Sequence, residues 1–164
     1  MDIYNYLTQQ QILDVKERIN SGCLFFQKNY VKRDNPFSCM RRKHCLTAEV
    51  LYEFAPNQLI STSEFRSDII HYGLQNKMTQ PEISTDKAIF HIYSDGADLK
   101  NAVIKDRCMK YNTNLEAPIF FVFRFCVDKN YQLLSVEAVF FDNDANVSDK
   151  TVVYKRTKVV NMAG

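Results

Sequence analysis

Basic residues crowd one short stretch of the chain, residues 28–43. This stretch holds six of the 21 Lys and Arg residues but one of the 19 Asp and Glu residues. The cations are Lys28, Lys32, Arg33, Arg41, Arg42 and Lys43, and the aromatic residues between them are Tyr30 and Phe37. Cations neutralise phosphates and release counterions, and exposed rings stack on bases. This basic segment therefore predicts a contact surface for a nucleic acid or for an acidic protein partner. The competing interpretation is a solvated loop whose rings face the core.

The same region also contains residues that could bind zinc. Cys39, His44 and Cys45 lie in or beside the basic segment, Cys23 precedes it, and thiolates with an imidazole are acceptable zinc ligands. The spacing argues against such a site, because structural zinc sites usually take ligand pairs about two to four residues apart. The adjacent residues His44 and Cys45 would also point to opposite faces of an extended chain. We therefore expect neither a metal nor a cofactor.

A corner between a strand and a helix is the third candidate site. His91, Tyr93, Ser94 and Asp95 follow one another where a short strand is predicted to end. If Asp95 begins a helix, free amides and the positive end of the helix dipole would favour an anion there. The imidazole could then hold an anion or act as a general base. The plainer interpretation is that Ser94 and Asp95 cap the helix while His91 occupies one face of the strand.

Arg124 stands out because phenylalanines surround it in the strongly apolar stretch 118–127. A buried guanidinium without a partner is costly, and Glu137 on the next predicted strand is its expected partner. If the sheet curves into a cone, Tyr93, Asp95, Arg124 and Glu137 would line a polar pocket inside it. A structural salt bridge is the competing interpretation.

The few glycines and cysteines, and the motifs that the sequence lacks, exclude several classes of binding and catalytic site. Four glycines occur in the whole chain and none of them forms a glycine-rich loop, which excludes dinucleotide-binding and Walker-type nucleotide sites. The motifs Gly-x-Ser-x-Gly, His-Glu-x-x-His and Cys-x-x-Cys are also absent. The five cysteines are an odd set without framework spacing, which indicates free thiols in a reducing compartment. The sequence therefore favours a protein that is not an enzyme.

The net charge and the distribution of apolar residues indicate where in the cell to expect the protein. The formal net charge is +2, and no run of residues is long and apolar enough for a membrane span or a signal peptide. We therefore expect an intracellular protein, cytoplasmic or nuclear, without a membrane partner.

Hydrophobic periodicity divides the chain into helices and strands. Thr8 and Gln11 form a capping box, which begins the first helix. Helices are predicted over residues 8–20, 63–74 and 97–111. Strands are predicted over residues 23–31, 46–54, 87–93, 118–127, 133–141 and 151–160. Helix is the main alternative for residues 46–54, and residues 78–85, which include Pro81, are predicted to form a loop.

These elements predict one α+β domain over residues 1–164. Its helices pack on a curved antiparallel sheet that ends in a C-terminal three-stranded meander. The order of elements is similar to that of the cone-shaped nuclear transport factor 2-like fold, and this similarity concerns element order alone. The alternative is a split βαβ sandwich backed by helices.

Three functions remain. The favoured one is a small non-enzymatic binding module that contacts nucleic acid, such as RNA, or an acidic protein through the basic segment. The first alternative is a host- or partner-directed protein interaction protein, because few Gly and Pro residues, no Trp and many Asn, Lys, Ile and Tyr residues are typical of AT-rich coding, including viral coding. The second is an enzyme or ligand carrier with the polar pocket inside a curved sheet.

Overall fold

The computed structural model describes residues 1–31, 42–58, 65–72 and 78–157. In these ranges a six-stranded sheet, with strands in the order β1-β2-β3-β4-β5-β6, carries helices on both faces. The helices are α1 (Gln9–Phe26), α2 (Arg42–Tyr52) and α3 (Ala102–Tyr111). The strands are β1 (Arg66–Tyr72), β2 (Met78–Ser84), β3 (Ala88–Ser94), β4 (Ile119–Val127), β5 (Leu133–Phe141) and β6 (Val147–Lys155). The predicted α+β class is confirmed.

The sheet is mostly antiparallel, with one exception. Strands β3 and β4 run parallel, and α3 connects them in a βαβ unit. Strands β4, β5 and β6 form the predicted antiparallel meander. The pairing of β5 with β6 is interrupted at two places, between Val136 and Glu137 and between Phe140 and Phe141.

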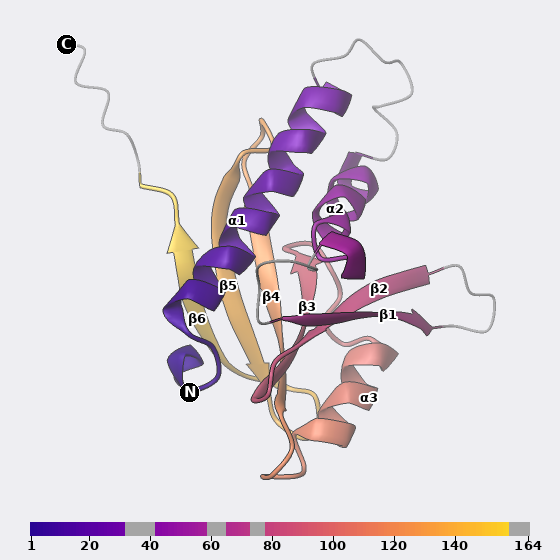
Figure 1. Cartoon of the computed structure of the whole chain (residues 1–164), viewed down its shortest axis with the longest axis vertical. Coiled ribbons are helices and arrows are strands. Elements are labelled where there is room, and N and C mark those ends of the chain that lie inside the picture. Colours follow the sequence, from indigo (N-terminus) through magenta and orange to yellow (C-terminus); the bar gives the residue numbers. More distant parts are fainter. Residues whose placement is uncertain (32–41, 59–64, 73–77, 158–164) are drawn as a thin grey trace.

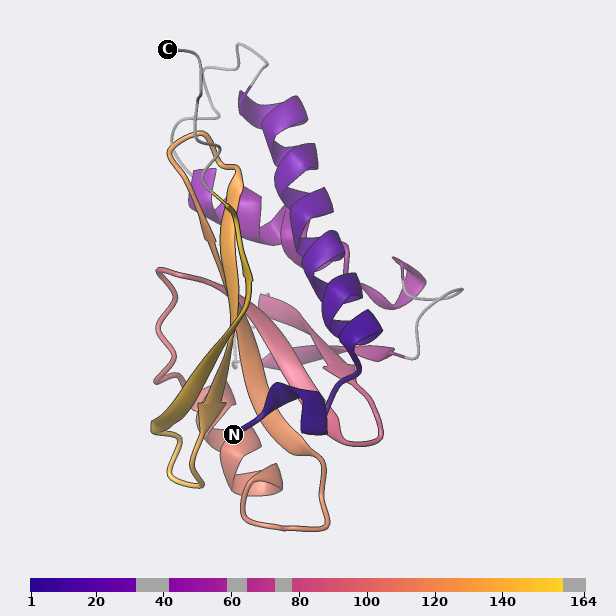
Figure 2. The ribbon, with the colours of Figure 1, turned by 90° about the vertical axis from the view of Figure 1, so that its left-hand side faces the viewer.

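Two apolar clusters hold the layers together. On one face, α1 and α2 pack against Phe90, Phe121, Phe123 and Phe140, as Figures 1 and 2 show from two sides. On the other face, α3 packs against a smaller cluster. Its buried members are Ile89, Leu99, Ile104, Cys108, Phe120, Val122, Val139, Phe141 and Ala145. Strand β4 is therefore covered on both faces, as its continuous apolar run predicts.

Helix α1 is longer than predicted, and the strand predicted over residues 23–31 is wrong. The buried positions Ile12, Val15 and Ile19 continue as Cys23 and Phe26, three or four residues apart along one helical face. Residues 27–31 continue the chain as a turn of π-helix. The sequence Ser-Gly at positions 21 and 22 does not end the helix, because the glycine serves close packing instead.

The strand predicted over residues 46–54 is also wrong, since α2 occupies this region. Leu46, Val50 and Phe54 are buried and four residues apart, while Tyr52 is exposed. Apolar residues at every second position satisfy the strand period and also place every fourth position on one helical face. Contact with α1 selects the helix.

Two further predictions, both between residues 63 and 85, differ from the structure. The helix predicted over residues 63–74 is wrong over residues 66–72, which form β1, and its residues 63, 64, 73 and 74 lie outside the described residues. The loop predicted over residues 78–85 is wrong, because residues 78–84 form β2, the antiparallel partner of β1. Pro81 is tolerated there because β2 pairs with β3 only through Ile83 and Ser84.

The remaining elements are confirmed with shifted ends. Helix α3 begins at Ala102, five residues later than predicted, and its N-cap is Asn101, whose side chain accepts a hydrogen bond from the Ile104 amide. Strand β6 begins at Val147 rather than at residue 151. The acidic loop before it is correspondingly shorter.

Gly22 generates the first testable prediction. A Cβ atom at this position would lie 2.6 Å from the Cα of Val50, so α1 and α2 touch backbone to backbone. We expect Gly22→Ala to lower the free energy of unfolding by about 1–3 kcal/mol, because the added methyl group forces the helices apart. Urea denaturation measures this loss. Ser21→Ala is the control, because Ser21 is exposed on the same helix. A Gly22→Ala protein as stable as the control would contradict the packing.

Candidate functional site

A buried polar network lies between α3 and the sheet. His91 on β3 is fully buried, and its Nε2 lies 2.8 Å from the Oε2 of Glu82 on β2. The same oxygen accepts a hydrogen bond of 2.6 Å from the Nε of Arg107 on α3. Arg107 also contacts Asp106, at 2.8 Å. The network therefore joins three elements across the smaller apolar cluster.

Burial favours the neutral form of His91. Burial lowers the pKa of His91, and the opposing effect of Glu82 does not restore it. Because a carboxylate only accepts, the imidazole proton lies on Nε2, and Nδ1 is a bare acceptor with no partner among the described residues. Burial acts to raise the pKa of Glu82, but hydrogen bonds from His91 and Arg107 outweigh it and lower this pKa.

The predicted corner of His91, Ser94 and Asp95 does not form a helix N-terminus. Helix α3 begins at residue 102, so the prediction that Asp95 caps it is wrong. His91 instead faces Phe120, whose ring centroid lies 5.0 Å away at a steep angle. The imidazole is enclosed beneath α3 and has no open route to a ligand at this corner.

Arg124 and Glu137 form a direct ion pair across β4 and β5. The Nε of Arg124 donates to the Oε1 of Glu137 at 2.7 Å, and both side chains are about one-fifth exposed. Tyr93 is the β3 partner of Arg124. Asp95 lies beside the same row, with its Oδ2 3.5 Å from the Sγ of Cys126. The four residues thus share one region of the α3 face of the sheet, where they form a partly exposed row.

The basic segment is only partly within the described residues. Lys32, Arg33, Phe37 and Arg41 lie outside them, as does Cys39 of the considered zinc set. Arg42 and Lys43 begin α2, but the structure describes only their backbone. Lys28 is exposed at the end of α1. The described parts of the segment therefore lie at one end of the pair formed by α1 and α2 (Figure 1).

Tyr30 has a structural role. Its ring stacks on Phe26 with centroids 5.2 Å apart, and its hydroxyl donates to Glu49 at 3.2 Å. Tyr30 also packs against the larger apolar cluster. Part of its ring is therefore covered by the core, and its role in stacking on a base stays a prediction.

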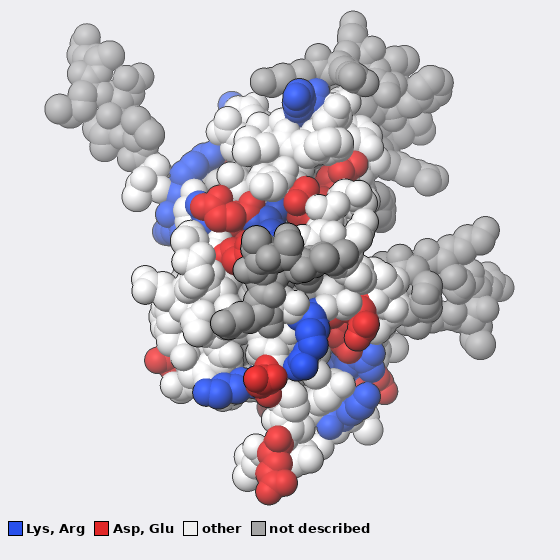
Figure 3. All heavy atoms as spheres, in the orientation of Figure 1, with Lys and Arg blue, Asp and Glu red and all other residues white. Residues whose placement is uncertain are grey.

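The same end of the molecule carries cations that the sequence patterns do not single out. Gln27 donates to the Tyr131 carbonyl at 2.8 Å, so the end of α1 touches the turn between β4 and β5. Arg156, just after β6, pairs with Asp128 in that turn at 3.0 Å. Lys129 and Lys155 also lie there and are exposed. Figure 3 shows Lys and Arg atoms at the upper ends of α1 and β6. We call this region, with Lys28, Arg42, Lys43, Lys129, Lys155 and Arg156, the basic end.

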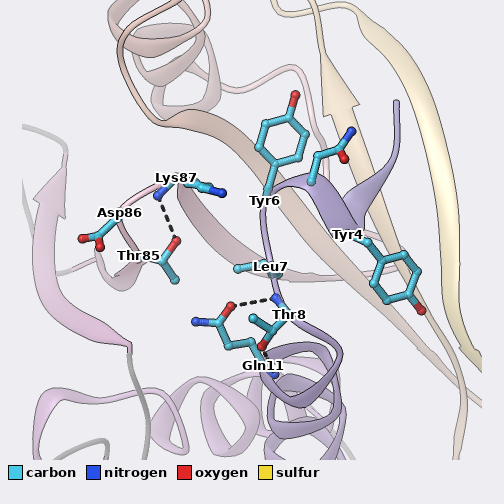
Figure 4. Close-up of a pocket in the computed structure, with 9 residues that line it drawn as sticks. Tyr4, Tyr6, Leu7, Thr8, Gln11, Thr85, Asp86 and Lys87 are labelled. Atoms are coloured by element: carbon cyan, nitrogen blue, oxygen red, sulfur yellow. Dashed lines mark hydrogen bonds between the residues drawn. The ribbon is translucent and has the colours of Figure 1, made fainter.

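A pocket of about 450 Å³ lies at the opposite end, beside the start of α1. Figure 4 shows Thr85, Asp86 and Lys87 on one side of it and residues 4–11 on the other. The Thr8 and Gln11 side chains are engaged in the capping box, and the Thr85 hydroxyl accepts from the Lys87 amide at 3.3 Å. These groups serve the local fold.

Three of the described cysteines, Cys23, Cys108 and Cys126, have raised pKa values. Burial raises the pKa of both Cys23 and Cys108 to about 12. Burial, together with Asp95, also raises the pKa of Cys126. No group of three or more His, Cys, Asp or Glu side chains among the described residues is arranged to hold a metal ion.

Comparison with known proteins identifies no relative: no protein family, curated protein or solved structure matches this chain. The similarity of element order to the nuclear transport factor 2-like fold therefore gains no support. Among the described helices, none combines the length and the apolar character that crossing a membrane requires.

The buried network predicts loss of stability in acid. The pKa values of His91 and Glu82 are both lower in the folded protein than their ordinary values of 6.5 and 4.5, so the unfolded chain binds more protons as the pH falls. The free energy of unfolding should therefore begin to decrease as the pH falls below the ordinary pKa of His91. It should decrease further through the ordinary pKa of Glu82. Urea denaturation at pH 7.5, 6, 5 and 4 measures this slope.

A His91→Gln variant separates the contribution of the imidazole to the pH dependence of stability from that of other titrating groups. The glutamine amide can still donate to Glu82 but does not titrate. The free energy of unfolding should therefore change less steeply between pH 7.5 and pH 5. The variant should also lose about 1–3 kcal/mol at pH 7.5 through altered packing. His71→Gln, on β1, removes a different histidine as the control. An unchanged slope in His91→Gln would contradict the assignment.

Proposed function

We propose that this chain is a non-enzymatic binding module that contacts nucleic acid through the basic end. The observation that carries the proposal is the gathering of cations from separate segments of the chain. Lys28 follows α1, Lys129 lies between β4 and β5, and Lys155 ends β6. None of these three has an ion-pair partner among the described residues, so their charge is available to a polyanion. Asp128, in the same region, is already paired with Arg156.

The distribution of charge along the chain supports the same proposal. Outside residues 28–43 the chain has 15 basic and 18 acidic residues, so the positive charge is concentrated in that segment. A local excess of cations on an otherwise acidic chain orients a polyanion toward one end of the molecule. A nucleic acid offers regularly spaced phosphates to cations that lie on several segments. An acidic protein surface is the other partner that this charge would accept.

Binding measurements with labelled RNA and DNA test the proposal. We expect fluorescence anisotropy to show binding that weakens strongly between about 50 and 200 mM salt, because phosphate contacts release counterions. Arg42→Ala with Lys43→Ala should weaken this binding and reduce its dependence on salt. Lys100→Ala with Lys105→Ala is the matched control, because it removes the same charge from exposed positions near α3.

The outcomes of these measurements distinguish a nucleic acid from an acidic protein as the partner. Binding that is lost in the Arg42/Lys43 variant and retained in the control supports the proposal, provided that circular dichroism shows both variants folded. Equal binding by the two variants would overturn the assignment to the basic end. Binding to polyglutamate without binding to any nucleic acid would overturn the nucleic-acid proposal and identify an acidic protein surface as the partner.

A further inference from the structure

A groove of about 830 Å³ lies where β6 ends, at the basic end of the molecule. Its lining residues are Cys126, Gln132, Leu134, Ser135, Lys155, Arg156 and Thr157. Cys126, Ser135 and Lys155 are neighbours across β4, β5 and β6, so part of the lining is the sheet itself. Each of these residues is described, and Lys32, Arg33 and Arg41 of the basic segment take no part in the lining.

The groove combines apolar atoms with one fixed cation, Arg156, and one unpaired cation, Lys155. Leu134 and Cys126 are half-buried and supply its apolar part. Arg156 is held by two hydrogen bonds from one Nη atom, to Asp128 at 3.0 Å and to Gln132 at 3.2 Å. Its backbone amide donates to the Leu134 carbonyl at 2.8 Å. The guanidinium is therefore positioned in advance, while the neighbouring Lys155 ammonium has no acidic partner among the described residues.

We propose that this groove binds a single-stranded nucleic acid, with phosphates on Lys155 and Arg156 and an unpaired base over Leu134. The inference rests on the proposed function and names the form of nucleic acid and a second part of its contact surface. A duplex covers each base with its stacked neighbours, so only an unpaired base can place its flat face on an apolar floor. Lys155, which has no acidic partner among the described residues, gives the groove edge a positive charge that is complementary to the phosphate backbone. Arg156, already paired with Asp128, contributes its remaining N–H donors.

The groove is connected to the rest of the basic end through the turn between β4 and β5. This turn holds Asp128 and Tyr131, which contact Arg156 on one side and Gln27 at the end of α1 on the other. Lys129 belongs to this turn, and Lys28 directly follows Gln27 in the sequence. A strand that lies in the groove can therefore continue toward the start of α2.

Charge-removing variants test the phosphate contacts. We expect Lys155→Gln with Arg156→Gln to weaken binding of a labelled single-stranded RNA about tenfold at 100 mM salt. The salt slope should fall by about 1.4, because each lost phosphate contact reduces it by about 0.7 for single strands. Lys87→Gln with Lys150→Gln removes the same charge at exposed positions away from the groove and should leave both quantities unchanged.

A tryptophan probe tests the base contact independently. The chain has no Trp, so Leu134→Trp introduces a single reporter. We expect its fluorescence to be quenched by single-stranded RNA and much less by a duplex of the same sequence. Leu13→Trp, at an exposed position on α1, should respond to neither.

The results distinguish failure of the groove from failure of the proposed function. If the groove variants bind as tightly as the original protein while Arg42→Ala with Lys43→Ala binds weakly, the groove inference is wrong and the proposed function stands. Preference for duplex over single strand, or no quenching of the tryptophan at position 134, would also overturn the groove inference. If the unmodified protein binds no nucleic acid at any salt concentration, both fail.

Discussion

The packing of β4 between two layers of helices is the interaction on which the rest of the structure depends. Phe121, Phe123 and Phe125 face α1 and α2, whereas Phe120 and Val122 face α3. Among the described residues the two helical layers lie on opposite faces of this strand, so the position of each depends on the side chains that β4 presents to it. The parallel partner β3 and the antiparallel partner β5 then fix where polar residues such as Arg124 can lie.

The interruption of apolar character along β4 also explains where the polar groups gather. Helix α3 covers the half of its sheet face that holds Phe120 and Val122. Beyond the helix, Arg124 and Cys126 occupy the same face and remain partly exposed. The buried network of His91 and the groove at the end of β6 are thus two regions of one sheet face, the first beneath α3 and the second beyond it. Burial makes the first structural, and exposure leaves the second available to a ligand.

The fold could be predicted from the sequence where a single periodicity applied. Strands β3, β4 and β5 have continuous or alternating apolar patterns, and their prediction is confirmed. Residues 46–54 satisfied both the strand and the helix period, and packing against α1, which includes the contact between Val50 and Gly22, decides between them. Residues 66–72 have a pattern that predicted a helix, yet they form β1, an edge strand whose hydrogen bonds come from its partner β2. The pairing of Arg124 with Glu137 followed from neighbouring strands, whereas Lys129 and Arg156 join the basic end only through tertiary contacts that no local pattern encodes.

The interrupted pairing of β5 with β6 has a consequence for the molecule in a crowded solution. Strand β6 is the last strand of the sheet, and an exposed edge is a template on which strands of other chains can add. Its two irregularities break the regular spacing of free amides and carbonyls, and Lys150 and Lys155 place charge along the same strand. An incoming strand would find a regular ladder only between Asp149 and Val152. The edge that carries the groove is therefore poorly suited to self-association and fibre growth.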